Sequence, residues 1–182
     1  MIHNSKLLFL TGIFLFSSCT EELPIEEGVF DNPLDENEID YETPAITFFP
    51  IVNDVVLGSN FIVSVFILAV EDLGGSYIKF SYDKQKLEYL NDEVGTMFDD
   101  AGQSPLCIVE VDENTGSITL NTSFLGSDST YVNGTGSLVD ITFRASLSGT
   151  SGLIFDPNSE LVTPSDDIIE IKYFGEGVVN AL

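Results

Sequence analysis

The stretch Tyr77-Ile78-Lys79-Phe80-Ser81-Tyr82 decides the fold class of this chain. Apolar and polar residues alternate along it, so its apolar side chains would share one side of an extended strand. Residues 117–121 and 139–144 repeat the alternation. A strand with one dry side and one wet side requires a second sheet to cover the dry side. The pattern therefore predicts an all-β fold of two sheets packed face to face.

Other strand patterns lie on both sides of this stretch. Nine strands are expected, at residues 45–51, 61–70, 76–82, 87–90, 107–111, 117–122, 137–145, 152–155 and 168–173. Residues 112–116 separate two of them and predict a hairpin turn with Gly116 at positive φ. Residues 93–105 are polar and contain glycine, which predicts a long surface loop. Beyond the first twenty residues, no segment has a helical period.

The first eighteen residues are typical of a secretion signal. Lys6 supplies a positive start, and residues 7–16 form an apolar core that is too short to span a bilayer, which needs about 20 residues. Leu15-Phe16-Ser17-Ser18-Cys19 then resembles a bacterial lipobox, after which the cysteine becomes the lipidated N-terminus. We expect a lipid on Cys19 to hold the protein at the cell outer membrane. Glu21 and Glu22 after Thr20 resemble the export signals that send some lipoproteins to the outer face of this membrane, so we expect the protein to be surface-exposed. The alternative is an ordinary secretory signal that is removed nearby.

Residues 19–43 predict a disordered acidic tether that precedes the domain at residues 44–182. They contain ten acidic residues and no basic residue, and like charges extend a chain. The cluster of Asp31, Asp35, Glu36 and Glu38 lacks the spacing of a calcium-binding loop, so no metal site is expected there.

The composition excludes several classes of function. The net charge of −24 repels nucleic-acid phosphates and anionic lipid headgroups, so neither a nucleic-acid partner nor a peripheral membrane face is expected. Contact with the membrane is expected through the N-terminal lipid only. Removal of the signal also removes His3, the only histidine. This excludes catalysis by a Ser-His or Cys-His pair and zinc sites built on imidazole. Cys107 lies in an apolar run and is expected to be a buried, inert thiol that forms no disulfide with Cys19.

Three stretches together resemble the cohesin domain family, whose members hold dockerin-bearing enzymes on bacterial scaffolds. They are GSNFIVSV at residues 58–65, LGGSYIKFSYD at residues 73–83 followed by Leu87, and GTGSLVDITF at residues 134–143. With Gly175, Gly177 and the two valines after it, their order covers residues 46–180. Many enzyme-anchoring members carry Asn and Asp at the start of the third strand. Here these positions hold Gly75 and Tyr77, a departure that bears on which dockerin is recognised.

The resemblance implies a nine-stranded jelly-roll sandwich, immunoglobulin-like in outline, with one flat outer face that binds the dockerin. The residues that it places on this face are Tyr77, Lys79 and Ser81 from the third strand, Thr119, Asn121 and Ser123 from the sixth, and Leu138, Asp140, Thr142 and Arg144 from the eighth. The implied function is that of a non-catalytic adapter at the cell surface, tethering polysaccharide-degrading enzymes. No cofactor is expected, and calcium would belong to the partner.

Two other functions are open at this point. A carbohydrate-binding module would share the sandwich fold. The chain has no Trp, so Tyr77, Tyr89 and Tyr131 would need to align on one face to stack against sugars. A glycosidase would need two converging carboxyl groups. Adjacent pairs such as Asp99-Asp100 or Asp166-Asp167 would point to opposite sides of a strand, so we do not expect an enzyme.

Overall fold

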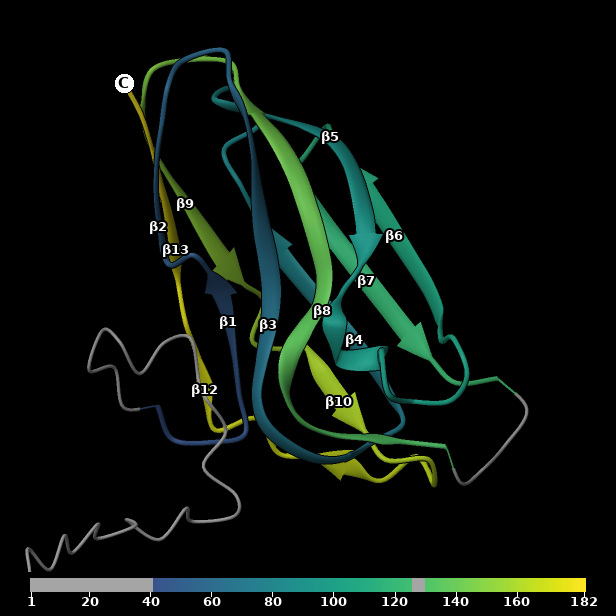
Figure 1. Ribbon diagram of the computed structural model, residues 1–182. Coiled ribbons are helices and arrows are strands. Elements are labelled where there is room, and N and C mark those ends of the chain that lie inside the picture. The colour runs from purple at the N-terminus through teal and green to yellow at the C-terminus, as the bar shows by residue number, and fades with distance from the viewer. Residues whose placement is uncertain (1–40, 126–129) are drawn as a thin grey trace, which may run out of the picture.

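The computed structural model of the chain describes residues 41–125 and 130–182 (Figure 1). The predicted signal peptide, the predicted lipidation site Cys19 and the tether up to residue 40 lie outside these residues and stay predictions. Within the described residues, no helix is long and apolar enough to cross a bilayer. The elements there are β1 (Ala45–Phe49), β2 (Val52–Val55), β3 (Asn60–Leu73), β4 (Gly75–Ser81), β5 (Leu87–Val94), the 3-10 helix η2 (Thr96–Phe98), β6 (Leu106–Asp112), β7 (Ser117–Ser123), β8 (Val132–Ala145), β9 (Gly149–Phe155), β10 (Glu160–Val162), β11 (Ile168–Ile169), β12 (Tyr173–Phe174) and β13 (Gly177–Ala181).

The strands form two sheets. The first sheet has the order β12-β1-β3-β8-β5. The second has the order β11-β10-β4-β9-β13-β2, with β7 paired to β4 and β6 paired to β7. Figure 1 shows the long strands β3 and β8 side by side, and β4 and β7 side by side in the other layer. The predicted all-β sandwich is confirmed.

The alternating stretches supply the core between the two sheets. Their inward side chains are at most 1% exposed: Ile78, Phe80, Ile118, Leu120, Val139, Ile141 and Phe143. Contacts across the core join the sheets, since the ring of Phe48 in β1 stacks on that of Phe155 in β9 with 4.1 Å between centroids. Aromatic side chains bury the largest apolar area per residue, so these rings dominate the packing energy.

The structure differs from the nine expected strands at the short elements. The sequence pattern misses β2, β10 and β13, and both β2 and β10 are too short to display an alternation. The prediction of one continuous strand at residues 168–173 is wrong. Its two ends form β11, which pairs with β10, and β12, which pairs with β1 in the other sheet.

The segment expected to be a long surface loop, residues 93–105, is partly structured. β5 continues to Val94, and η2 then buries Met97 and Phe98, each 7% exposed. The ring of Phe98 meets that of Phe124 edge to face at a centroid distance of 5.8 Å. The loop prediction is therefore wrong for the first half of this segment, where two apolar side chains close one side of the core.

The hairpin turn between β6 and β7 is confirmed. Gly116 has a φ of 72°, and a Cβ there would lie 2.6 Å from the carbonyl oxygen of Tyr82. The carboxylate of Asp112 accepts the N–H of Asn114 at 2.9 Å and the hydroxyl of Thr115 at 2.8 Å. These bonds hold the turn and fix the register between β6 and β7.

A second, small apolar cluster lies on the outer side of the first sheet. Ala45 and Leu68 are cross-strand partners buried there, and Tyr41 is among the side chains that pack against them. The ring of Tyr41 also lies 4.5 Å from that of Tyr173 in β12. The chain therefore enters the domain over the outer side of the first sheet.

Candidate binding face

The outward side of the second sheet is a regular grid of side chains. Tyr77 in β4 pairs with Asn121 in β7, which pairs with Ile108 in β6. The row formed by Lys79, Thr119 and Glu110 runs parallel to it, two residues further along β4. We name the outward side of β6, β7, β4 and the adjoining β9, β10 and β11 the candidate face, and the outward side of the first sheet the opposite face.

Six of the predicted binding residues lie together on the candidate face. They are Tyr77, Lys79 and Ser81 on β4, and Thr119, Asn121 and Ser123 on β7. Their neighbours along each strand are buried in the core, so the alternation of the sequence places them outward. Tyr77 is 41% exposed and is the one large aromatic side chain of this group.

The prediction that residues of β8 share this face is wrong. β8 pairs with β3 and β5 in the first sheet, so Asp140, Thr142 and Arg144 lie on the opposite face. Arg144 there donates to the side chain of Asn60 at 3.2 Å and forms an ion pair with Glu88 at 3.5 Å. On the edge of β4 that does not pair with β7, the neighbouring strands are β9 and β10.

Leu138, also expected to point outward, is fully buried. The register between β3 and β8 shifts at this point, where Val65 pairs with Val139 and Phe66 pairs with Ser137. Leu138 is the extra residue of the bulge, and three consecutive side chains of β8 are buried there. A bulge breaks the two-residue period on which the prediction depended.

Sequence reasoning missed the apolar part of the candidate face. Leu106 and Ile108 on β6 are 42% and 43% exposed, Ile154 on β9 is 50% exposed and Ile168 on β11 is 72% exposed. The run of apolar residues at 106–109 predicted a buried segment. A two-residue period read along all of β6 is the signal that finds Leu106 and Ile108, because they alternate with half-buried side chains.

Cys107 is half-buried rather than buried, since β6 is the last strand of its sheet. Burial, and to a smaller extent the nearby carboxylate of Asp92, raise the pKa of the Cys107 thiol. A raised pKa leaves the thiol protonated near neutral pH, which agrees with an inert cysteine.

Polar contacts inside and beside the sheet hold the candidate face rigid. The hydroxyl groups of Ser76 and Thr122 are hydrogen-bonded at 2.6 Å beneath the face and join β4 to β7. On the other side of β4, the N–H of Lys79 donates to the hydroxyl of Ser159 at 3.0 Å, and the N–H of Asp156 donates to the carbonyl oxygen of Lys79 at 2.7 Å. These contacts bridge the interruption between β9 and β10, so the grid continues across it.

The charge of the candidate face is mainly negative. Glu110, Asp112 and Glu160 are exposed, and Lys79 is half-buried among them. The hydroxyl of Thr115 and the N–H of Asn114 lower the pKa of Asp112, so this carboxylate is ionised at neutral pH. In the described part of the chain, no three His, Cys, Asp or Glu side chains are grouped as metal ligands would be.

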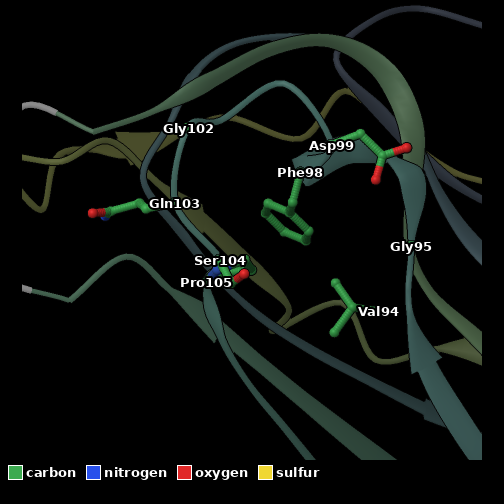
Figure 2. Close-up of a pocket in the computed structure, with 8 residues that line it drawn as sticks. All are labelled: Val94, Gly95, Phe98, Asp99, Gly102, Gln103, Ser104 and Pro105. Atoms are coloured by element: carbon green, nitrogen blue, oxygen red, sulfur yellow. The ribbon is translucent and has the colours of Figure 1, made fainter.

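A cavity of about 520 Å³ adjoins the Leu106 end of the candidate face. It is lined by residues 94–95, 98–99 and 102–105. Figure 2 shows Phe98 and Val94 reaching into it, while the side chain of Gln103 points away. Phe98, which lines the cavity, also makes the edge-to-face contact with the ring of Phe124.

The three tyrosines considered for sugar stacking do not align. Tyr77 lies on the candidate face, whereas Tyr89 packs against Phe143 in the first sheet. Tyr131 directly precedes β8, also in the first sheet. They therefore form no common platform for a polysaccharide chain.

Comparisons by sequence found no matching family model and no matching curated protein. Comparisons by structure found several similar domains. A type II cohesin domain from the cellulosome of Acetivibrio cellulolyticus matches with a TM-score of 0.66 and 16% identity, over 76% of this chain and 96% of that one. The sixth cohesin of scaffoldin B from the same organism, solved in complex with a Cel5 dockerin, matches with a TM-score of 0.63 and 17% identity, over 76% and 98%. The domain has the cohesin fold.

A third similar structure is a cohesin described as non-cellulosomal. A non-cellulosomal cohesin from the archaeon Archaeoglobus fulgidus matches with a TM-score of 0.62 and 18% identity, over 76% of this chain and 90% of that one. The matched share of the chain is close to the share that lies between the first residue of β1 and the last residue of β13, residues 45–181. The resemblance of residues 46–180 to cohesins is therefore confirmed at the level of the fold.

Proposed function

We propose that this chain is a non-catalytic adapter at the cell surface, whose cohesin-like domain binds a dockerin-type or related protein module on the candidate face. The observation that carries the proposal is the set of exposed apolar side chains on one hydrogen-bonded sheet: Tyr77, Leu106, Ile108 and Ile154. Structurally similar cohesins have been solved in complex with dockerins, which supports a protein module as the ligand.

The chemistry of the face supports binding of a protein. Large apolar side chains in the middle of a polar surface are typical of the energetically dominant part of protein interfaces, and Tyr is enriched there. Tyr77 has polar neighbours on both sides, Asn121 on β7 and Glu160 on β10. A rigid sheet loses little conformational entropy on binding, so more of the contact energy appears as affinity.

The proposal includes an anchor and a role. A lipid on Cys19 would hold the domain at the cell outer membrane, and a bound module would bring a polysaccharide-degrading enzyme to the surface. The entry of the chain at Tyr41, over the opposite face, supports this arrangement, because it leaves the candidate face free of the tether's attachment point.

A capture experiment tests the proposed partner. The full chain, immobilised through a C-terminal tag, is exposed to the secreted proteins of the producing cell in calcium and in chelator, and bound proteins are identified by mass spectrometry. We expect recovery of a dockerin-bearing protein by the parent chain and by Arg144→Ala, which changes the opposite face, and at least tenfold less by Tyr77→Ala. Recovery of no dockerin-bearing protein in either condition would overturn the proposal.

A fractionation experiment tests the anchor. The parent chain is expected in the outer-membrane fraction and a Cys19→Ser variant in the soluble fraction, since a thioether-linked lipid needs the cysteine sulfur. Equal membrane association of both chains would contradict lipidation at Cys19.

A further inference from the structure

A cavity outside the candidate face lies at one end of the sandwich. It is enclosed by the turn that follows β4, the first residues of β5 and the β6–β7 hairpin at Glu113, and its volume is about 350 Å³. Ligand cavities commonly measure about 300–1,000 Å³, so this one has room for a small ligand. None of the residues expected on a dockerin-binding face lines it.

Hydrogen bonds hold the walls of this cavity in place. The carboxylate of Asp83 accepts the N–H of Gln85 at 3.0 Å and so fixes the turn after β4. The N–H of Tyr82 donates to the carbonyl oxygen of Gly116 at 2.8 Å, which joins this turn to the β6–β7 hairpin. A preformed cavity loses little conformational entropy when a ligand enters it.

Two tyrosines line the cavity, and their hydroxyl groups differ. The rings of Tyr82 and Tyr89 both pack against Phe143, with centroid distances of 5.3 Å and 6.5 Å. The hydroxyl of Tyr89 donates to the carboxylate of Asp92. The hydroxyl of Tyr82 has no hydrogen-bond partner among the described residues, and its oxygen is not fully enclosed. Only the hydroxyl of Tyr82 is therefore available to a ligand.

The other polar groups of the cavity complete a set of donors and acceptors. The side-chain amide of Gln85 and the carboxylate of Glu113 are exposed, and neither is hydrogen-bonded to a described residue. With the hydroxyl of Tyr82, they offer both kinds of hydrogen-bonding group. The hydroxyl groups of a sugar each donate and accept, so a sugar can use such a set. The half-buried ring of Tyr89 adds an aromatic wall for the C–H groups of a sugar ring.

The charges around the cavity favour a neutral ligand. Burial first, and then the carboxylates of Glu113 and Asp112, raise the pKa of Tyr82. The negative charge near this hydroxyl disfavours an anionic ligand. The ammonium group of Lys84, which donates to the carbonyl oxygen of Asn114, also lines the cavity and opposes a cationic one.

We infer that the cavity binds one neutral sugar unit, such as the end of a saccharide chain, through the hydroxyl of Tyr82, the amide of Gln85 and the carboxylate of Glu113. This site goes beyond the proposed function, because it lies apart from the candidate face and needs no dockerin. It also differs from a platform of three tyrosines, since Tyr89 is the only one of that set that lines the cavity.

A titration with neutral disaccharides tests this inference on the full chain. The probes are cellobiose, xylobiose, mannobiose, galactobiose and diacetylchitobiose, with digalacturonic acid as the anionic control and lysine amide as the cationic control. Binding is followed by calorimetry and by NMR of ¹³C-labelled tyrosine rings. We expect at least one neutral disaccharide to bind with a dissociation constant of about 1 mM or below. Both charged probes should bind at least tenfold more weakly than this disaccharide.

The two tyrosines of the cavity provide a matched pair of variants. Tyr82→Phe keeps the ring against Phe143 and removes only the available hydroxyl, so it should weaken binding about fivefold, as for one hydrogen bond. Tyr89→Phe removes a hydroxyl that Asp92 already uses and should change the affinity by less than about twofold. Glu113→Ala should weaken binding at least tenfold, because its carboxylate makes a stronger, charge-assisted hydrogen bond.

The tyrosine signals locate the bound sugar. Those of Tyr82 and Tyr89 should shift, while those of Tyr77 on the candidate face and Tyr131 should stay in place. The inference is overturned by the absence of binding of all five disaccharides at about 10 mM. Equal losses for Tyr82→Phe and Tyr89→Phe, tighter binding of a charged probe, or shifts centred on Tyr77 would overturn it as well.

Discussion

The two outer faces of the sandwich follow the same alternation of inward and outward side chains. They differ in how far the chain itself covers their outward side chains. On the candidate face, Tyr77 is exposed in the middle of the sheet and Ile108 is exposed on its edge strand β6. On the opposite face, Tyr41 covers the apolar cluster around Leu68, and Arg144 is paired with Glu88. Residues of the same chain thus cover part of the opposite face, where Ile62 stays exposed. On the candidate face, Tyr77, Ile108 and Ile154 are all left uncovered.

The comparison of the two faces indicates that the binding face of a sandwich is recognised by the outward side chains that its own chain leaves uncovered. Alternation assigns each side chain to the inside or the outside of its sheet. It does not distinguish an outer side chain that is covered by its own chain from one that awaits a partner. Contacts far apart in the sequence, such as that of Tyr41 with Tyr173, decide this difference.

The largest expected effect is on the free energy of unfolding, and it concerns the core between the two faces. Phe80 is 1% exposed and meets the rings of Phe48 and Phe155 edge to face. Phe80→Ala should lower the free energy of unfolding by about 3–5 kcal/mol, because it removes contacts and leaves a cavity. Ser81→Ala, the next residue and exposed on the candidate face, should change it by less than about 0.5 kcal/mol. Equal effects in chemical denaturation would contradict the assignment of inward and outward sides.

The next effect concerns binding and separates the two faces. Tyr77→Ala should weaken association with the captured partner by about 2 kcal/mol or more, as expected for an aromatic residue in the centre of an interface. Arg144→Ala should leave the affinity unchanged within about 0.5 kcal/mol, since Arg144 lies on the opposite face. Calorimetry of both variants measures the difference. A greater loss of affinity for Arg144→Ala than for Tyr77→Ala would place the partner on the opposite face and contradict the proposal.

A smaller effect concerns stability on the opposite face. Tyr41→Ala removes the contact with the ring of Tyr173 and should cost about 1 kcal/mol of folding free energy, with partner affinity unchanged. Tyr131→Ala is the matched control, because Tyr131 is 46% exposed. No loss of stability in Tyr41→Ala would show that the small apolar cluster around Ala45 and Leu68 does not depend on residues before β1.

The smallest effect is a pH dependence at Tyr89. Burial first, and then the hydrogen bond to Asp92, raise the pKa of Tyr89 above its ordinary value of about 10. A raised folded-state pKa gives stability that is fully present below pH 10 and is lost as the pH rises toward the folded-state value. Between pH 9 and 11, the parent chain should therefore lose slightly more stability than Tyr89→Phe. Identical slopes would contradict the raised pKa.

Particular residues show which parts of the structure can be predicted from the sequence and which cannot. The outward positions of Tyr77, Lys79 and Asn121 follow from alternation alone, and the structure confirms them. The sheet to which β8 belongs does not follow, because alternation is a local signal and strand pairing is decided by contacts far along the chain. The bulge at Leu138 reverses the side of one residue. The adjacent apolar residues Leu138 and Val139 interrupt the alternation there, but the sequence alone does not show that both are buried.

The place of Ile168 on the candidate face also could not be predicted from the sequence, for a related reason. Ile168 is distant from Tyr77 along the chain, and β10 is too short to be recognised as a strand. The pattern joined β11 to β12 in one expected strand and so gave no sign that β11 pairs with β10. Only the pairing of Val162 with both Gly75 and Ile168 brings these side chains to the same end of β4.

The most direct test of the central claim is an NMR titration of the isoleucine methyl groups with the captured partner. If the candidate face binds the partner, the signals of Ile108, Ile154 and Ile168 will shift or broaden, while that of Ile62 will not move. Shifts at Ile62 with unchanged signals from the other three would place the partner on the opposite face and contradict the account.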